Sequence, residues 1–203
     1  LHPLQVSFGR FVFASMLWSS IWFGTRQRLE SVHWRLHGIR VVLGYLTGTA
    51  IFWSASLMVL ADATAISFLS PVVTLFLAWL FLRERVGWRR IFAVGIMVTG
   101  AMVLLRPGTA AFQPAAFIAL FAALAGGGES IAIKMLTNRE RLLQILFVNN
   151  LLGVVLATAI ASLVWVWPSP VQWLQLVSVG VGMAAAQLSF TWSMRQVEAS
   201  VIM

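Results

Sequence analysis

Apolar residues run along this chain in long stretches that contain no charged side chain. Residues 41–60 and 63–82 form two such stretches, and a third extends from residue 142 to residue 194. About 20 apolar residues are enough for a helix to cross the hydrocarbon core of a bilayer. The pattern therefore predicts an all-α, polytopic membrane helix bundle.

Turn and charge signals between the apolar stretches divide the chain into seven spans and the start of another near Ala199. Pro71 lies inside the third span, where it removes one backbone hydrogen bond and is expected to kink the helix. The predicted spans are 4–24, 41–60, 64–82, 88–105, 115–134, 142–166 and 171–194.

Composition supports a lipid environment for most of the 203 residues. Hydrophobic residues make up 60% of the chain, charged residues only 10%, and the mean hydropathy is +0.90. A soluble domain has about a quarter of its residues charged. The chain has no cysteine, which excludes disulfides, thiolate chemistry and cysteine-bound metals.

The net charge of +8 raises the question of nucleic-acid binding, but the positions of the basic residues give a different explanation. Short cytoplasmic loops of membrane proteins are rich in Lys and Arg. With the spans above, twelve of the fourteen basic residues fall on one face, which is therefore predicted to be cytoplasmic, and only Arg10 and Arg106 fall on the other. The twelve are Arg26, Arg28, Arg35, Arg40, Arg83, Arg85, Arg89, Arg90, Lys134, Arg139, Arg141 and Arg195. No nucleic-acid partner is expected.

A short motif occurs twice, 136 residues apart. Asp62, Ala63 and Thr64 correspond to Glu198, Ala199 and Ser200, and small residues such as Gly44 and Gly180 also match at this offset. Five predicted spans separate the two copies, so the copies lie on opposite sides of the membrane and the repeat is inverted. Inverted repeats are typical of secondary transporters. We predict a first repeat at 1–108 and a second at 109–203.

Each copy of the motif also resembles a turn that caps the following helix. Asp62 and Thr64 are predicted to accept hydrogen bonds from the exposed amides of that helix, and Glu198 and Ser200 to do the same in the second copy. Near the cytoplasmic rim of the first repeat, Glu84 lies among arginines and is predicted to form structural ion pairs with them.

Residues 60–108 resemble the first-repeat signature of the drug/metabolite transporter superfamily, EamA-like branch. The residues that carry the resemblance are Asp62, Ser70-Pro71, Leu82-Arg-Glu84, Gly95 and Gly100. The resemblance implies ten helices in two inverted sets of five that move small metabolites across the bacterial inner membrane. Against that plan, the chain is expected to lack the first helix and the last ones. "ADATAISFLSP" and "RPG" also resemble members associated with S-adenosylmethionine uptake.

Two charged residues inside spans are candidate substrate-binding residues, because ionisable groups at membrane depth are costly. Arg10 either binds an anionic part of the substrate or extends to the outer headgroups. Glu129 either titrates or pairs with a cation, or it pairs with a basic loop residue such as Lys134. "LQVSFGR" (4–10) aligns with "LQILFVN" (143–149), which places Asn149 at the position equivalent to Arg10.

Amides and tryptophans complete the candidate site. Asn149, Asn150 and Gln187 are expected to face the bundle, where they either line a cavity or hold helices together. Trp18, Trp53 and Trp192 lie deep in their spans. They either stack on a flat substrate or a cation, or they pack against helices and lipid.

The favoured function is an inner-membrane secondary transporter of a small organic metabolite, S-adenosylmethionine-like or amino-acid-like. A non-catalytic assembly or structural subunit is the alternative. An intramembrane enzyme is disfavoured because His2, His33 and His37 lie near loops and no metal-binding helix motif occurs. No nucleotide-binding motif and no cofactor are expected, and a homodimer stays open.

Overall fold

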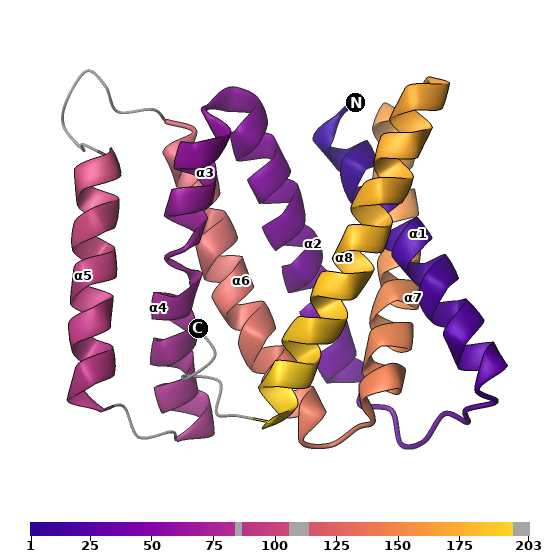
Figure 1. Ribbon diagram of the computed structural model, residues 1–203, viewed down its shortest axis with the longest axis horizontal. Coiled ribbons are helices and arrows are strands. Elements are labelled where there is room, and N and C mark those ends of the chain that lie inside the picture. Colours follow the sequence, from indigo (N-terminus) through magenta and orange to yellow (C-terminus); the bar gives the residue numbers. More distant parts are fainter. Residues whose placement is uncertain (84–86, 106–113, 197–203) are drawn as a thin grey trace. The chain divides into compact units, whose positions relative to one another are not determined.

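The computed structural model describes residues 1–83, 87–105 and 114–196, and these residues form helices and no strand (Figure 1). This confirms the all-α prediction. The helices are α1 (Pro3–Gly24), α2 (Trp34–Leu57), α3 (Leu60–Ser67), α4 (Ser70–Leu77), α5 (Trp88–Leu105), α6 (Ala116–Thr137), α7 (Leu142–Ala161) and α8 (Pro170–Gln196). A π-helical segment, Ala78–Leu82, extends α4, and a 3₁₀ turn, Ser162–Val164, extends α7.

Five helical stretches in the described part of the chain are long and apolar enough to cross a membrane. They are Pro3–Gly24, Leu60–Leu82, Ala116–Thr137, Leu142–Val164 and Pro170–Gln196. The two other long helices, α2 and α5, carry arginines in or near their first turns. The chain is a multi-pass membrane protein, as its hydrophobic pattern predicts.

The third predicted span is interrupted where Pro71 was expected to bend it. Helix α3 ends at Ser67 and α4 begins at Ser70, with Pro71 in its first turn. Proline has no amide hydrogen to donate to the preceding turn, and its ring favours the start of a helix over its interior. The predicted kink is therefore a break between two short helices.

The predicted capping role of Asp62 and Thr64 is wrong. Helix α3 begins at Leu60, so the motif lies inside the helix, and Val59 at the N-cap position makes no side-chain bond. The Thr64 hydroxyl donates back to the carbonyls of Leu60 and Ala61, at 2.8 and 2.9 Å. Asp62 lies in the first turn, where its charge complements the helix dipole. The second copy at Glu198, and Glu84, lie outside the described residues.

The chain forms two compact units. Unit 1 consists of Leu1–Tyr45 together with Ala132 to the end of α8, so it contains α1, α7 and α8 whole, the beginning of α2 and the end of α6. Unit 2 contains Leu46–Ile131. The proposed repeats at 1–108 and 109–203 stay a prediction.

Close helix packing in unit 1 depends on glycines. A Cβ added to Gly153 of α7 would overlap the ring of Phe11, and one added to Gly180 of α8 would overlap the Cβ atom of Phe13. Helix α1 therefore lies directly against both α7 and α8, which Figure 1 shows side by side with it. In a lipid-solvated bundle, small residues allow this approach and the van der Waals contact that it brings.

In unit 2, a glycine likewise allows close packing between α6 and α4. A Cβ on Gly126 would lie 3.0 Å from the Ser70 hydroxyl oxygen. Ile66 of α3 packs with Ala116 and Ala119 of α6 in a small apolar core. Many large apolar side chains of α5, including Ile91, Phe92 and Val103, remain exposed, as expected for a helix in lipid.

Candidate functional site

Buried polar side chains gather in unit 1. In lipid, each such group needs a hydrogen-bonding or charged partner inside the protein, so this concentration marks the candidate functional site. We name it the polar interior of unit 1. Its members are Gln5, Ser7, Arg10, Ser15, His37, Arg40, Glu140, Gln144, Asn149, Asn150 and Thr191, and each is at most 9% exposed.

Arg10 points into the bundle. Its side chain is 4% exposed, its Nη2 atom donates to the carbonyl of Gly44 at 3.0 Å, and its guanidinium carbon lies 4.4 Å from the centroid of the Phe11 ring. The alternative that Arg10 extends to the outer headgroups is therefore wrong, because the carbonyl and the ring hold it between α1 and α2. Whether it binds a substrate stays a prediction.

A second buried arginine, Arg40, was missed by the sequence analysis. It was assigned to a cytoplasmic loop because the second span was predicted to start at Val41, whereas α2 begins at Trp34. Arg40 is 1% exposed and its Nη1 atom donates to the carbonyl of Ile145 on α7, at 3.3 Å. Its position four residues before Gly44 places both on one face of α2, a signal that the sequence does contain.

The predicted amides come together in part. Asn150 donates from Nδ2 to Oε1 of Gln187 at 2.8 Å and to the carbonyl of Leu146 at 2.8 Å, so it links α7 to α8. Its Oδ1 atom is buried without a hydrogen-bond partner among the described residues. The neighbouring Asn149 is 3% exposed. The Asn150–Gln187 hydrogen bond thus links the two helices, as one of the two predicted roles requires. The Oδ1 atom of Asn150 is the acceptor that this bond leaves unused.

The three candidate tryptophans differ in exposure. Trp18 is buried against Ala14, Leu146 and Ala184, and its indole nitrogen has no hydrogen-bond partner in the described part of the chain. Trp53 and Trp192 are 43% and 55% exposed. Of the three, Trp18 is therefore the one whose side chain is buried inside unit 1.

Glu129 and Trp53 belong to unit 2. Glu129 is half-buried on α6, beside the close-packed glycines Gly126 and Gly127. Its role as a titrating or cation-pairing group stays a prediction.

The site also contains a buried carboxylate with several polar partners, Glu140, which the sequence analysis did not select. Its Oε1 atom accepts from the amide of His33 at 2.7 Å and lies 3.0 Å from Nδ1 of the same residue. Its Oε2 atom lies 2.9 Å from Nε2 of His37 and accepts from Nε2 of Gln144 at 2.8 Å. Four polar groups from three segments thus surround one carboxylate. No group of three metal-ligating side chains with the arrangement of a metal site occurs among the described residues.

These contacts keep Glu140 ionised. Burial by itself raises the pKa of a carboxyl group, but the hydrogen bonds from His37, the His33 amide and Gln144 outweigh burial and hold the pKa of Glu140 below its usual value. Glu140 lies in the loop between α6 and α7, outside the spanning helices. Its contact with His37 connects that loop to the first turn of α2.

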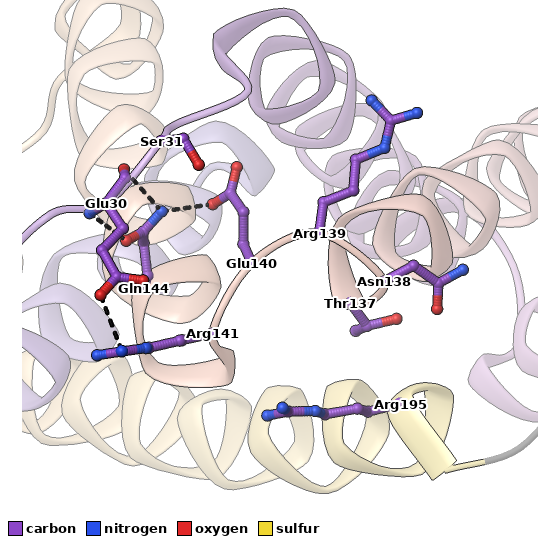
Figure 2. Close-up of a pocket in the computed structure, with 9 residues that line it drawn as sticks. All are labelled: Glu30, Ser31, Thr137, Asn138, Arg139, Glu140, Arg141, Gln144 and Arg195. Carbon is purple, nitrogen blue, oxygen red and sulfur yellow. Dashed lines mark hydrogen bonds and ion pairs between the residues drawn. The ribbon is translucent and has the colours of Figure 1, made fainter.

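A cavity of about 250 Å³ adjoins Glu140 at this end of unit 1 (Figure 2). Gln144 connects its two sides: its Oε1 atom accepts from the amide of Glu30 at 3.0 Å while its Nε2 atom donates to Glu140. The lining residues are Glu30, Ser31, Thr137, Asn138, Arg139, Glu140, Arg141, Gln144 and Arg195.

Comparison with solved structures shows the fold. A protein of known crystal structure, 19% identical in sequence, superposes with a TM-score of 0.73 over 100% of this chain and 74% of its own. At that identity the likeness concerns the helix arrangement alone.

Comparison with characterised proteins gives relatives that cross membranes. An "S-adenosylmethionine uptake transporter" of Rickettsia felis is 28% identical over 83% of this chain and 58% of its own length. The "pseudopaline exporter CntI" of Pseudomonas aeruginosa is 25% identical over 81% of this chain and 58% of its own. The chain thus spans a little over half the length of these relatives.

The sequence pattern of one family covers more than half of the chain. Residues 1–106 match the EamA-like transporter family. This family and the relatives above are named for transport and not for an enzymatic reaction, in agreement with the expectation from the sequence. The chain belongs to the EamA-like transporter family.

Proposed function

We propose that this chain forms part of a secondary transporter that moves a small organic metabolite across the bacterial inner membrane by alternating access between inverted repeats. The observation that carries the proposal is the polar interior of unit 1, in a chain that belongs to a transporter family. A bundle that served only as a structural anchor would gain nothing from burying two guanidinium groups, since each is costly to remove from water.

Arg10 and Arg40 define the substrate class that fits this interior. A guanidinium group binds a carboxylate through two parallel hydrogen bonds, and a site with little water strengthens the attraction. Both arginines use backbone carbonyls, of Gly44 and Ile145, as neutral partners. A substrate carboxylate would be a stronger partner than a carbonyl and could replace it at low cost.

The other groups suit the remainder of an amino-acid-like molecule. Trp18 offers a buried aromatic face, and the unfilled acceptor of Asn150 could accept a hydrogen bond from a substrate donor such as an ammonium group. Asn149 precedes Asn150 in the sequence and is also buried, and Gln187 accepts a hydrogen bond from Asn150 across the α7–α8 contact. An S-adenosylmethionine-like or amino-acid-like zwitterion combines these features, and the Rickettsia relative is named for such a substrate.

Uptake into proteoliposomes that contain the protein tests the proposal. Radiolabelled S-adenosylmethionine and a panel of amino acids would be offered under a proton or sodium gradient, with empty liposomes as the control. We expect accumulation of at least one solute, and a loss of about tenfold or more in apparent affinity for Arg10→Gln, since a charge-assisted bond contributes about 1.5–3 kcal/mol.

The matched control is Arg35→Gln, because Arg35 is exposed in the first turn of α2. No transport under any gradient, together with a stable partner protein on gentle purification, would favour the assembly subunit instead. Equal loss in Arg35→Gln and Arg10→Gln would reject the assignment of Arg10 to the substrate.

A further inference from the structure

The cavity beside Glu140 is lined by none of the residues that the transport proposal assigns to the substrate. We propose that it binds the phosphate group of an anionic ligand, supplied either by a lipid headgroup or by a soluble phosphate. The cavity lies wholly within unit 1, between the loop before α2, the α6–α7 loop, the first turn of α7 and the last turn of α8 (Figure 2). The inference does not rest on the proposed transport function.

Positive charge dominates the open part of the cavity. Three arginines line it, and Arg139 and Arg195 make no ion pair with any residue in the described ranges. Arg141 pairs with Glu30 at 2.8 Å, but both side chains are more than half exposed, so the pair is weak and can rearrange. Glu140 also lines the cavity, but its side chain is 1% exposed and its oxygens already have partners in His33, His37 and Gln144.

The arginines of the cavity come from different segments, with Arg141 at the start of α7 and Arg195 near the end of α8. In Figure 2 the guanidinium group of Arg141 points toward Glu30 and away from Arg195, and Arg139 extends away from both. A planar carboxylate is satisfied by a single guanidinium fork. A tetrahedral phosphate has enough oxygens for more than one fork, so a cavity lined by several arginines favours phosphate.

The backbone at the start of α7 adds to the positive electrostatic potential of the cavity. Arg141 is the N-cap residue of α7 and makes no side-chain cap, and the first turn of α7 has no acidic residue. The partial positive charge at this helix end therefore has no carboxylate to balance it within the turn. Ser31 and Asn138 line the cavity and add neutral hydrogen-bond donors.

The position of the cavity makes both sources of phosphate accessible. The cavity lies at the end of unit 1 that carries Lys134, Arg139, Arg141 and Arg195, which the distribution of basic residues assigns to the cytoplasm. Lys134 is itself fixed there, because its Nζ atom donates to the carbonyl of Met194 at 2.7 Å. Lipid phosphates of the inner leaflet and soluble cytoplasmic phosphates both occur at this level.

The experiment uses the purified 203-residue chain with two separate probes. Binding of inorganic phosphate would be titrated by calorimetry in uncharged detergent. Lipid binding would be measured as phosphatidylglycerol retained in native mass spectra after incubation with mixed phosphatidylcholine and phosphatidylglycerol vesicles. The variants are Arg195→Gln and Arg141→Gln, with Arg35→Gln as a control that removes the same charge from an exposed position outside the cavity. Circular dichroism would check that each variant is folded.

We expect each cavity variant to weaken binding about tenfold, the effect of one lost charge-assisted contact, and the control to change it little. Loss of phosphate binding alone assigns a soluble ligand, loss of lipid retention alone assigns a headgroup, and loss of both assigns a site open to either. The proposal is overturned if neither probe binds the unchanged chain, or if Arg35→Gln reduces binding as much as Arg195→Gln. These outcomes are independent of any transport measurement.

Discussion

The Nε2 atom of His37 lies 2.9 Å from Oε2 of Glu140, and both side chains are almost completely buried. This contact joins residues 103 positions apart and connects the first turn of α2 with the α6–α7 loop. His33 and Gln144 complete the surroundings of the carboxylate. The contact therefore fixes how the loops at this end of unit 1 meet.

Replacement of Glu140 by Gln should destabilise unit 1 by about 2–4 kcal/mol, since removing one partner from a buried charged network leaves the others without compensation. Glu30→Gln is the matched control, because Glu30 is 56% exposed and its pair with Arg141 should contribute at most about 1 kcal/mol. Unfolding in mixed micelles, followed by circular dichroism, measures both. Equal destabilisation by the two variants would contradict a structural role for the buried network.

The stability contributed by Glu140 should depend on pH in a defined direction. Its pKa in the folded protein is below the usual value of 4.5, so its contribution is complete above pH 4.5 and is lost as the pH falls through the lower, folded value. The difference in stability between the unchanged chain and Glu140→Gln should therefore hold from pH 8 to pH 5 and shrink below 4.5. A difference that already shrinks above pH 5 would show that the pKa is raised.

Gly153→Ala should separate α1 from α7. The added methyl group would overlap the Phe11 ring, which is 2% exposed and has no room to move away, and overpacking of this kind costs about 1–3 kcal/mol. Gly182→Ala on α8 is the control, because a Cβ atom there meets nothing within 4 Å and alanine is the better helix former. Thermal unfolding of the two variants should change in opposite directions. A stabilised Gly153→Ala would disprove the close packing of α1 on α7.

The hydrogen bond between Asn150 and Gln187 should contribute modestly to stability. A double-mutant cycle with Asn150→Ala and Gln187→Ala should give a coupling of about 0.6 kcal/mol, the average for such bonds between membrane helices. Reversible unfolding in micelles supplies the four free energies. A coupling near zero would mean that Asn150 is retained for its free acceptor and not for helix association.

Much of the architecture follows from local pattern. Long apolar stretches predict the helices to within a few residues in most cases, because a bilayer permits only structures that satisfy their own backbone groups. Pro71 predicts the break in the third span for an equally local reason, the missing amide hydrogen. The exception is α2, whose first two turns contain Arg35, His37 and Arg40 and look like a loop when judged by polarity.

The candidate site depends on which face each helix turns inward, and the sequence pattern does not show this. Arg10, Trp18, Asn149 and Asn150 could be selected because polar or bulky groups at membrane depth are unusual wherever they point. Trp53 and Trp192 satisfy the same criterion but are 43% and 55% exposed. The position of a residue within an apolar stretch does not reveal which face of the helix meets the lipid.

The sequence by itself thus determined that the chain is a multi-pass helical membrane protein and that some polar residues, such as Arg10 and Asn150, lie at membrane depth. Only the tertiary structure decided that Arg40 is buried, that Arg10 turns inward to Gly44, and that His33, His37 and Gln144 converge on Glu140. The reason is physical: helix formation in lipid is governed by hydrogen bonds between near neighbours in the chain, whereas the environment of a charge is set by groups that packing brings from distant segments.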